Sequence, residues 1–150
     1  MDIIIDLDGT LADLTHRRHL VATKPKNWKA FFALASKDTC IEPIAMIARG
    51  FAMGNRVIIC SGRPDDLREV TEAWLSKHVW EEARWLNHSG LYMRKTGDYR
   101  PDDIVKRELY DEILRDGFRP VLAIDDRMRV IEMWKSLGLL VLAVNGGDDF

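Results

Sequence analysis

The sequence has few of the features that mark membrane, secreted or zinc-binding proteins. No apolar run approaches 18 residues, so we expect no membrane-spanning helix and no membrane partner. Only two cysteines occur, Cys40 and Cys60, and their spacing fits neither a disulfide framework nor a zinc site. With no signal peptide, they are interpreted as reduced thiols of a cytoplasmic protein, Cys60 within a buried strand.

The phosphate-binding loop motif G-x-x-x-x-G-K-[ST] is also missing. Because that loop holds the phosphates of ATP in many kinases, we expect no ATP site and no ATP-dependent phosphorylation. Internal repeats and low-complexity tracts are absent as well. What remains is a chain of 150 residues with 47% hydrophobic composition, which can supply one core. We therefore predict a single domain over residues 1–150.

Net charge is small, but basic residues are concentrated in one segment. The chain carries 22 basic and 24 acidic residues, for a net charge of −2. Residues 14–37 contain six basic side chains and no acidic one. The six are Arg17, Arg18, Lys24, Lys26, Lys29 and Lys37. A basic segment in an otherwise acidic chain predicts contact with a polyanion, and the alternative is a solvated helical face.

The N-terminal residues combine a buried strand with a pair of carboxylates. Residues 2–5 form an apolar run typical of strands that are covered on both faces. The sequence Asp6-Leu7-Asp8-Gly9-Thr10 follows at once, and its glycine lets the chain turn. Ligands bind at the carboxyl ends of strands in an open parallel sheet, so we expect both carboxylates to lie in a site. An Asp-rich turn without function is the alternative.

Strand and helix signals alternate along the rest of the chain. The predicted strands are 2–5, 56–60, 91–93, 120–124 and 139–144, and the predicted helices are 41–51, 64–77, 101–117 and 130–137. This alternation predicts an α/β fold with a doubly wound, Rossmann-like parallel sheet of five strands. Pro64 is expected at a first helical position, and Ile104 on a buried helix face. Residues 78–89, with Trp80 and Trp85, fit either a short helix or a loop packed against the sheet edge.

The connection between the first two strands is longer than one crossover needs. Asp6 and Ser61 lie 55 residues apart, against about 25 to 30 for such a unit. The helix at 41–51 accounts for the crossover and leaves about residues 12–40 as an insertion at the end of the first strand. Its aromatic residues suffice for a small helical cap. Trp28 is interpreted either as part of the cap core or as a platform on which a base stacks.

Polar groups of related chemistry follow three of the predicted strands. Asp6 and Asp8 follow the first, Ser61 and Arg63 the second, and Asp125 and Asp126 the fourth, while Lys106 comes from a helix. Four carboxylates at one sheet edge repel one another unless a cation is present, and Mg²⁺ prefers such oxygen ligands. A carboxylate can also serve as a nucleophile toward a phosphoryl group. The pattern predicts transfer of a phosphoryl group, in which the protein positions the reacting groups and stabilises the charge on the phosphoryl oxygens.

The order of these motifs resembles that of the haloacid dehalogenase (HAD) superfamily. The motifs are D-x-D-G-T, then a serine, then a lysine, then a pair of aspartates. Over nearly the whole chain the sequence resembles the phosphatase domain of bacteriophage polynucleotide kinase–phosphatases more closely still. The segments that carry this resemblance are 6–10, Arg17, 61–63, 97–106, 123–127, 132–134 and 147–150. The resemblance implies a fold of HAD type and a phosphatase that works through an aspartyl-phosphate.

The resemblance also implies roles for individual residues. Asp6 is the expected nucleophile, and Asp8 the general acid and then the base. Ser61 and Lys106 are expected to bind the phosphoryl group. The expected Mg²⁺ ligands are Asp6, the backbone carbonyl of Asp8, and Asp126, with Asp125 beside them. The candidate substrate-binding residues are Thr10, Arg17, Trp28, Gly62, Arg63 and Asp102.

The sequence therefore predicts a Mg²⁺-dependent phosphatase that removes the 3′-phosphate from DNA or RNA ends or from nucleotides. A phosphatase of free mononucleotides is the alternative within the fold. From another class, the alternative is a non-catalytic HAD-like accessory module, although such a module does not need the acid at Asp8. Oligomeric state is left open.

For several other residues we expect a structural or surface position and no role in the site. Trp134 is expected in the core, and His16 and His19 on the surface. Asp148 and Asp149 are expected at a solvated terminus.

Overall fold

Five parallel strands form the central sheet of the computed structural model, which describes residues 1–145 except for the side chain of Glu82. The strand order is β5-β4-β1-β6-β7, so the N-terminal strand lies at the centre. The strands are β1 (Asp2–Ile5), β4 (Arg56–Pro64), β5 (Gly90–Arg94), β6 (Pro120–Asp125) and β7 (Leu140–Ala143). The C-terminal segment 147–150, including Asp148 and Asp149, lies outside the described residues.

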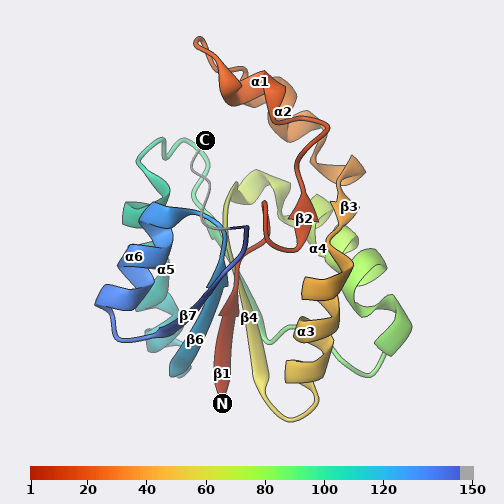
Figure 1. Cartoon of the computed structure of the whole chain (residues 1–150), viewed down its shortest axis with the longest axis vertical. Helices are drawn as coiled ribbons and strands as arrows, with labels where there is room; N and C mark the ends of the chain where they lie inside the picture. Colours follow the sequence, from red (N-terminus) through yellow and green to blue (C-terminus); the bar gives the residue numbers. More distant parts are fainter. Residues whose placement is uncertain (146–150) are drawn as a thin grey trace.

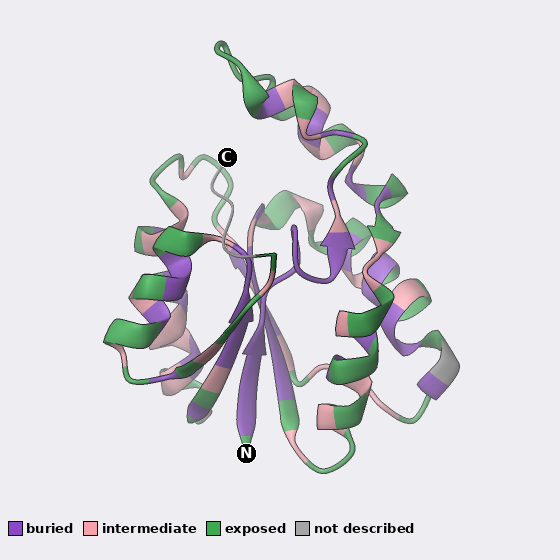
Figure 2. Ribbon diagram, in the orientation of Figure 1, coloured by how far each residue is buried: buried purple, intermediate pink, exposed green. Residues whose placement is uncertain are grey.

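Helices pack on both faces of this sheet (Figure 1). Alternate side chains of β1 explain the arrangement: Ile3 and Ile5 join the core that includes helices α3 (Glu42–Ala52) and α4 (Arg68–Leu75). Ile4 joins the core on the other face, beneath α5 (Asp102–Arg115) and α6 (Met128–Ser136). Figure 2 shows β1 buried along its length. The predicted doubly wound α/β fold with a five-stranded parallel sheet is confirmed.

The residues expected to form the cap rise above the carboxyl end of the sheet (Figure 1). Two short antiparallel strands, β2 (Ala12–Asp13) and β3 (Thr39–Cys40), connect this part to the sheet. Between them lie α1 (His19–Ala22), α2 (Trp28–Ala33) and the 3₁₀ turn η1 (Ala35–Lys37). Leu14, Val21 and Phe31 are buried together and form a small core of their own. No helix among the described residues is long and apolar enough to cross a membrane.

Two local predictions are wrong. Pro64 ends β4 with an extended backbone (φ −65°, ψ 147°), and α4 begins only after the 3₁₀ turn η2 (Asp65–Leu67). The fixed φ of proline suits an extended residue as well as a helical one, so the residue type alone could not decide. Ile104 is 43% exposed, because the buried stripe of α5 is Val105, Leu109 and Ile113 at four-residue spacing. Ile104 precedes this stripe by one residue, which turns its side chain away from the sheet.

Residues 78–89 form helical turns first and then a loop. Helix α4 continues into a π-helical turn, η3 (Ser76–Trp80), and a 3₁₀ turn, η4 (Glu81–Ala83). Trp80 is buried in the core, and its indole N–H donates to His88 Nδ1 at 3.1 Å. Trp85 is 79% exposed and does not pack against the sheet edge.

Candidate active site

The carboxyl ends of β1, β4 and β6 bring the predicted catalytic side chains to one place. Asp6 follows β1, Asp125 ends β6, and Lys106 reaches the same point from the second turn of α5. The turn after β1 requires a glycine, because Gly9 has φ +86° and an added Cβ would lie 2.0 Å from Asp126 Oδ2. The chain therefore turns sharply directly after Asp8, with its backbone packed against Asp126.

Lys106 is buried and binds two carboxylates. Its Nζ donates to Asp6 Oδ1 at 2.6 Å and to Asp125 Oδ2 at 2.9 Å. Burial alone would lower the pKa of Lys106, but Asp125 and Asp6 outweigh burial and raise it, so the ammonium keeps its charge. Thr10 Oγ1 donates to the second oxygen of Asp6 at 3.0 Å. Both oxygens of Asp6 are thus oriented by neighbouring donors.

Three buried carboxylates meet around this lysine. Asp6, Asp125 and Asp126 each offer an oxygen within 4.8 Å of the others. Burial, with the charges of Asp125 and Asp126, raises the pKa of Asp6, and burial beside Asp125 raises the pKa of Asp126 to about 6. One ammonium does not balance three negative charges, so the cluster has an excess of negative charge that a cation would relieve.

The two adjacent aspartates differ in their hydrogen bonds. Asp125 Oδ2 accepts from Lys106 and from the indole N–H of Trp134 at 3.1 Å, and its Oδ1 accepts from the backbone N–H of Arg127 at 3.3 Å. Asp126 Oδ1, by contrast, is buried and has no hydrogen-bond partner among the described residues. An oxygen-only set with an unpaired buried carboxylate oxygen fits a hard divalent cation. Trp134 is fully buried, as predicted, and it also orients Asp125.

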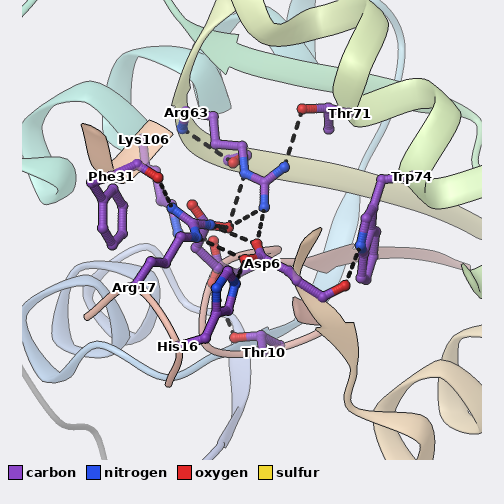
Figure 3. Close-up of polar contacts among 12 residues, drawn as sticks. Asp6, Thr10, His16, Arg17, Phe31, Arg63, Thr71, Trp74 and Lys106 are labelled. Carbon is purple, nitrogen blue, oxygen red and sulfur yellow. Dashed lines mark hydrogen bonds and ion pairs between the residues drawn. The ribbon is translucent and has the colours of Figure 1, made fainter. Parts of the chain in front are cut away.

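Two buried arginines, Arg17 and Arg63 (labelled in Figure 3), bind the other carboxylate, Asp8. Arg63 donates to Asp8 Oδ1 from Nε at 2.9 Å and from Nη2 at 2.6 Å, and Arg17 Nη2 donates to the same oxygen at 3.2 Å. Burial opposes the ionisation of Asp8, but the guanidiniums of Arg63 and Arg17 outweigh burial and lower its pKa. Asp6 and Asp8 therefore lie in opposite electrostatic surroundings.

Asp38 completes this group, and the sequence did not reveal it. Its Oδ1 accepts from Arg17 Nε at 2.7 Å, and its Oδ2 accepts from Arg17 Nη2 at 2.6 Å and from Arg63 Nη2 at 2.8 Å. We call Asp8, Arg17, Asp38 and Arg63 the arginine clamp. The available signal was indirect: Asp38 is the first acidic residue after the basic segment 14–37. A buried arginine needs such a partner.

The clamp removes one of the six cations of segment 14–37 from the cap surface. Arg17 is fully buried, and its guanidinium binds Asp8, Asp38 and the backbone carbonyl of Phe31. His16 and His19 are exposed as predicted, although His16 Nε2 lies 2.7 Å from Asp38 Oδ1.

A cavity of about 500 Å³ opens above Asp6 and Asp8 between the cap and the sheet. Its walls include three further predicted residues, Trp28, Gly62 and Asp102. Ser61 is fully buried at the end of β4, where its Oγ accepts from the backbone N–H of Arg63 at 3.1 Å. A larger cavity of about 670 Å³ lies along α4 and Trp80, and its walls contain none of the predicted residues.

Asp102 connects two arginines that the sequence prediction did not assign. Asp102 forms ion pairs with Arg94 and with Arg127 Nη1, the latter at 2.9 Å. Gly62 permits this approach, because an added Cβ would lie 2.5 Å from Asp102 Oδ1. Arg127 directly follows the Asp125-Asp126 pair, and this adjacency was the signal that could have identified it.

The sequence of this chain is similar to those of known proteins. The family model described as the polynucleotide kinase PNKP phosphatase domain matches residues 1–150. A protein of the Autographa californica nuclear polyhedrosis virus, provisionally named a bifunctional polynucleotide kinase/RNA ligase, is 24% identical over 142 residues. That match covers 90% of this chain and 18% of the viral protein.

Solved structures agree in fold. A chain from the structure of a Pnkp1/Rnl/Hen1 complex is 35% identical with a TM-score of 0.77, and the match covers 98% of this chain and 46% of that one. A HAD family enzyme of Bacteroides thetaiotaomicron, solved as a magnesium complex, has a TM-score of 0.57 at 13% identity and covers 99% of this chain and 95% of that one. The latter likeness concerns the fold alone. This chain spans less than half the length of the viral protein and of the Pnkp1/Rnl/Hen1 chain.

Proposed function

The chain belongs to the PNKP phosphatase domain family of HAD phosphatases, and from this premise we propose that it is a Mg²⁺-dependent phosphomonoesterase that removes the 3′-phosphate from DNA or RNA ends. The observation that carries the proposal is the contrast between Asp6 and Asp8 in one cavity wall. Asp6 binds a lysine, and Asp8 binds two arginines. These separate contacts allow the two carboxylates separate roles. The arginines by themselves favour the charged form of Asp8, so its role as proton donor requires the negative charge of a bound phosphate nearby.

Asp6 is the proposed nucleophile. One of its oxygens attacks the phosphorus, the bond from phosphorus to the 3′ oxygen breaks, and an aspartyl-phosphate forms. Lys106, 2.6 Å from Asp6 Oδ1, balances charge on the carboxylate and on the transferred group. Thr10 holds the other oxygen, so the carboxylate is oriented before substrate arrives.

Asp8 is the proposed general acid, and then the base. The guanidiniums of Arg17 and Arg63 converge on Oδ1, so Oδ2 is the oxygen that would carry the proton. An incoming phosphate dianion raises the pKa of a nearby carboxyl, which opposes the effect of the arginines. Asp8 would give its proton to the leaving 3′ oxygen and later take one from the water that attacks the aspartyl-phosphate.

Asp6, Asp126 and the backbone carbonyl of Asp8 are the proposed ligands of Mg²⁺, with Asp125 in support. The unpaired Oδ1 of Asp126 and the three clustered carboxylates support this assignment. A bound divalent cation supplies charge neutralisation for the carboxylates and for the phosphoryl oxygens.

The cations around the cavity favour a nucleic-acid end over a free mononucleotide. Lys26 and Lys29 from the cap, together with Arg129, belong to the same walls as Asp6 and Asp8. A mononucleotide brings one phosphate, which the lysine and the metal at the base of the site already neutralise. An oligonucleotide brings further phosphates that could lie against these cations. The polynucleotide kinase in the viral relative's name agrees with such a substrate.

The test is phosphate release from a 3′-phosphorylated oligonucleotide beside 3′- and 5′-mononucleotides, with Mg²⁺ and with EDTA. We expect release from the oligonucleotide with Mg²⁺, much less from mononucleotides, and none with EDTA. Asp6→Asn should abolish turnover, because an amide cannot form the acyl-phosphate. Asp8→Asn should reduce kcat by about 10²- to 10⁴-fold.

Each alternative has its own outcome in this assay. Equal kcat/KM on the oligonucleotide and the 3′-mononucleotide would favour a mononucleotide phosphatase. No release from any substrate with Mg²⁺ would favour a non-catalytic accessory module. Asp6→Asn activity within tenfold of wild type would exclude Asp6 as the nucleophile.

A further inference from the structure

The loop between β5 and α5 is fixed on both sides of Tyr99. Arg94, at the end of β5, donates from Nη1 to the backbone carbonyl of Asp98 at 3.0 Å and to that of Arg100 at 2.6 Å. Its Nε donates to the carbonyl of Gly62 at 2.9 Å, which ties the loop to the end of β4. The Asp98 carboxylate accepts from the backbone N–H of Arg100 at 3.0 Å. The backbone that carries Tyr99 is therefore well ordered.

Tyr99 is nevertheless 90% exposed, and it belongs to the wall of the cavity that contains Asp6 and Asp8. A buried aromatic side chain contributes a large apolar area to a core, and Tyr99 contributes almost none. Trp85 is similarly exposed, but it does not line this cavity. A planar ring on a hydrogen-bonded loop in the wall of the proposed phosphate site is accessible to a planar ligand, and its backbone needs little reordering on binding.

Trp28, the aromatic residue that the sequence suggested for stacking, is already engaged within the cap. Its ring stacks on Phe32 with centroids 5.8 Å apart and an interplanar angle of 20°, and it meets Phe31 edge to face at 5.6 Å. Lys26 Nζ lies 5.4 Å from the centre of the same ring. Only 37% of Trp28 is exposed. Of these two cavity aromatics, Tyr99 offers far more open ring surface.

We propose that Tyr99 is a stacking platform for a nucleobase within the last two nucleotides of the substrate strand. This inference rests on the proposed function. Phosphates of the strand would lie toward Lys26 and Lys29 of the cap, and the base would lie on the β5–α5 loop, so the strand would enter between these walls. Base–aromatic stacking tolerates any base, because every base has a π-face.

The experiment measures kcat/KM for wild type, Tyr99→Ala, Tyr99→Phe and the matched control Trp85→Ala. Two 3′-phosphorylated oligonucleotides of equal length are compared, one intact and one without bases on its last two nucleotides. We expect Tyr99→Ala to lose roughly 5- to 100-fold on the intact strand and to match wild type on the strand without bases. Tyr99→Phe keeps the ring and should stay within threefold of wild type, as should Trp85→Ala.

An equal effect of Tyr99→Ala on both strands would overturn the stacking platform, and so would no effect on either. A loss in Tyr99→Phe equal to that in Tyr99→Ala would assign the role to the hydroxyl and would also overturn it. Wild type that releases no phosphate from the intact strand would instead refute the proposed function. Thermal unfolding midpoints of the four proteins should agree, because both side chains are exposed.

Discussion

The position of the Asp8 side chain depends on Asp38. It binds both arginines that bind Asp8, and its own side chain is completely buried. Its backbone carbonyl accepts from the indole N–H of Trp74 at 2.8 Å, so it is fixed to α4 as well. Because Arg17 and Asp38 come from the cap and Arg63 from β4, the clamp joins the cap to the sheet at the candidate acid.

Asp38→Ala should destabilise the protein and misplace Asp8. Removing one partner of a buried ion pair leaves an uncompensated charge, and the expected loss is about 3 to 5 kcal/mol of unfolding free energy. We expect kcat to fall by at least tenfold under conditions in which the variant remains folded. Urea unfolding and initial rates measure both effects, with Asp111→Ala, an exposed partner of Arg107, as control. Wild-type kcat in folded Asp38→Ala would show that Asp8 does not need the clamp.

Asp126→Ala should lose more Mg²⁺ affinity than Asp125→Ala. Asp126 has an unpaired buried oxygen, whereas the oxygens of Asp125 already accept from Lys106, Trp134 and Arg127. Titration calorimetry of each variant with Mg²⁺ measures the order. The reverse order would identify Asp125 as the direct ligand.

Mg²⁺ should also raise the thermal midpoint of wild type relative to EDTA, because a ligand that binds only the folded state stabilises it.

At the scale of elements, the site depends on how closely strand ends and turns approach one another. The turn after β1 lies against Asp126, and the end of β4 lies against Asp102 at the start of α5. Glycine occupies both contact points, so the backbone itself forms part of the packing. These contacts join β1, β4, α5 and β6 around Asp6.

Gly62→Ala should impair catalysis more than stability. The new Cβ would lie 2.5 Å from Asp102 Oδ1, which must move and release Arg94 or Arg127. We expect about a tenfold loss of kcat/KM, since a small misplacement near the chemistry is costly. The control is Gly50→Ala in α3, where no atom outside the adjacent residues and the helix backbone lies within 4 Å of the added Cβ. That variant should gain roughly 0.5 to 1 kcal/mol of stability and keep its activity.

The opposite end of the sheet gives a pH-dependent prediction. Asp2 accepts from Arg56 Nε and Nη2, both at 2.7 Å, and from the backbone N–H of Arg119 at 2.6 Å. Hydrogen bonds from Arg56, followed by that from Arg119, outweigh burial and lower the pKa of Asp2. Its stabilising effect is therefore complete above the unfolded-state pKa of about 3.9 and is lost as pH falls through the lower folded-state value.

Asp2→Asn should accordingly lower the unfolding free energy at pH 7 by about 1 kcal/mol, since Arg56 is half exposed. The difference from wild type should shrink as pH falls below about 4. Urea unfolding of both proteins between pH 7 and pH 3 measures it. A difference that stays constant over this range would mean that the charge of Asp2 is not what stabilises the strand ends.

For the whole molecule, the distribution of charge matters more than its sum. A net charge of −2 predicts no general affinity for nucleic acid. The cap, however, places Lys26 and Lys29 at the cavity while the clamp buries Arg17. Positive charge of the cap thus lines the cavity, beside the carboxylates of Asp66, Asp98 and Asp102 in the same walls.

The advantage of an oligonucleotide over a 3′-mononucleotide should shrink as salt increases. Neutralising Z phosphates of a single strand gives a slope of log kcat/KM against log salt of roughly −0.7Z. Lys29→Ala should reduce the magnitude of this slope by roughly 0.7. The control is Lys77→Ala, because Lys77 is exposed and does not line the cavity that contains Asp6 and Asp8. Equal salt slopes in wild type and Lys29→Ala would mean that the cap lysine contacts no phosphate.

The sequence alone determined the fold and the residues grouped at its centre. Buried strands such as 2–5 are evident because both faces must be apolar, and the helices alternate with them. Carboxylates that directly follow such strands must gather at one sheet edge, so the proximity of Asp6, Asp125 and Asp126 could be predicted from topology. Lys106 was assigned through the family resemblance, and its contact with Asp6 agrees with that assignment.

Only the tertiary structure decided which side chains bind the site carboxylates and which aromatic side chains stay exposed. Arg17 lies in a turn and Asp38 in a connecting position of the cap, outside its helices and strands, and their pairing depends on how the cap folds back over β4. The same applies to Tyr99, because Arg94 fixes its loop through backbone carbonyls that every residue has. Local patterns predict which side chains face a core, since burial follows the period of a strand or helix. Ion pairs between distant loops have no such period, so they emerge only when the chain is folded.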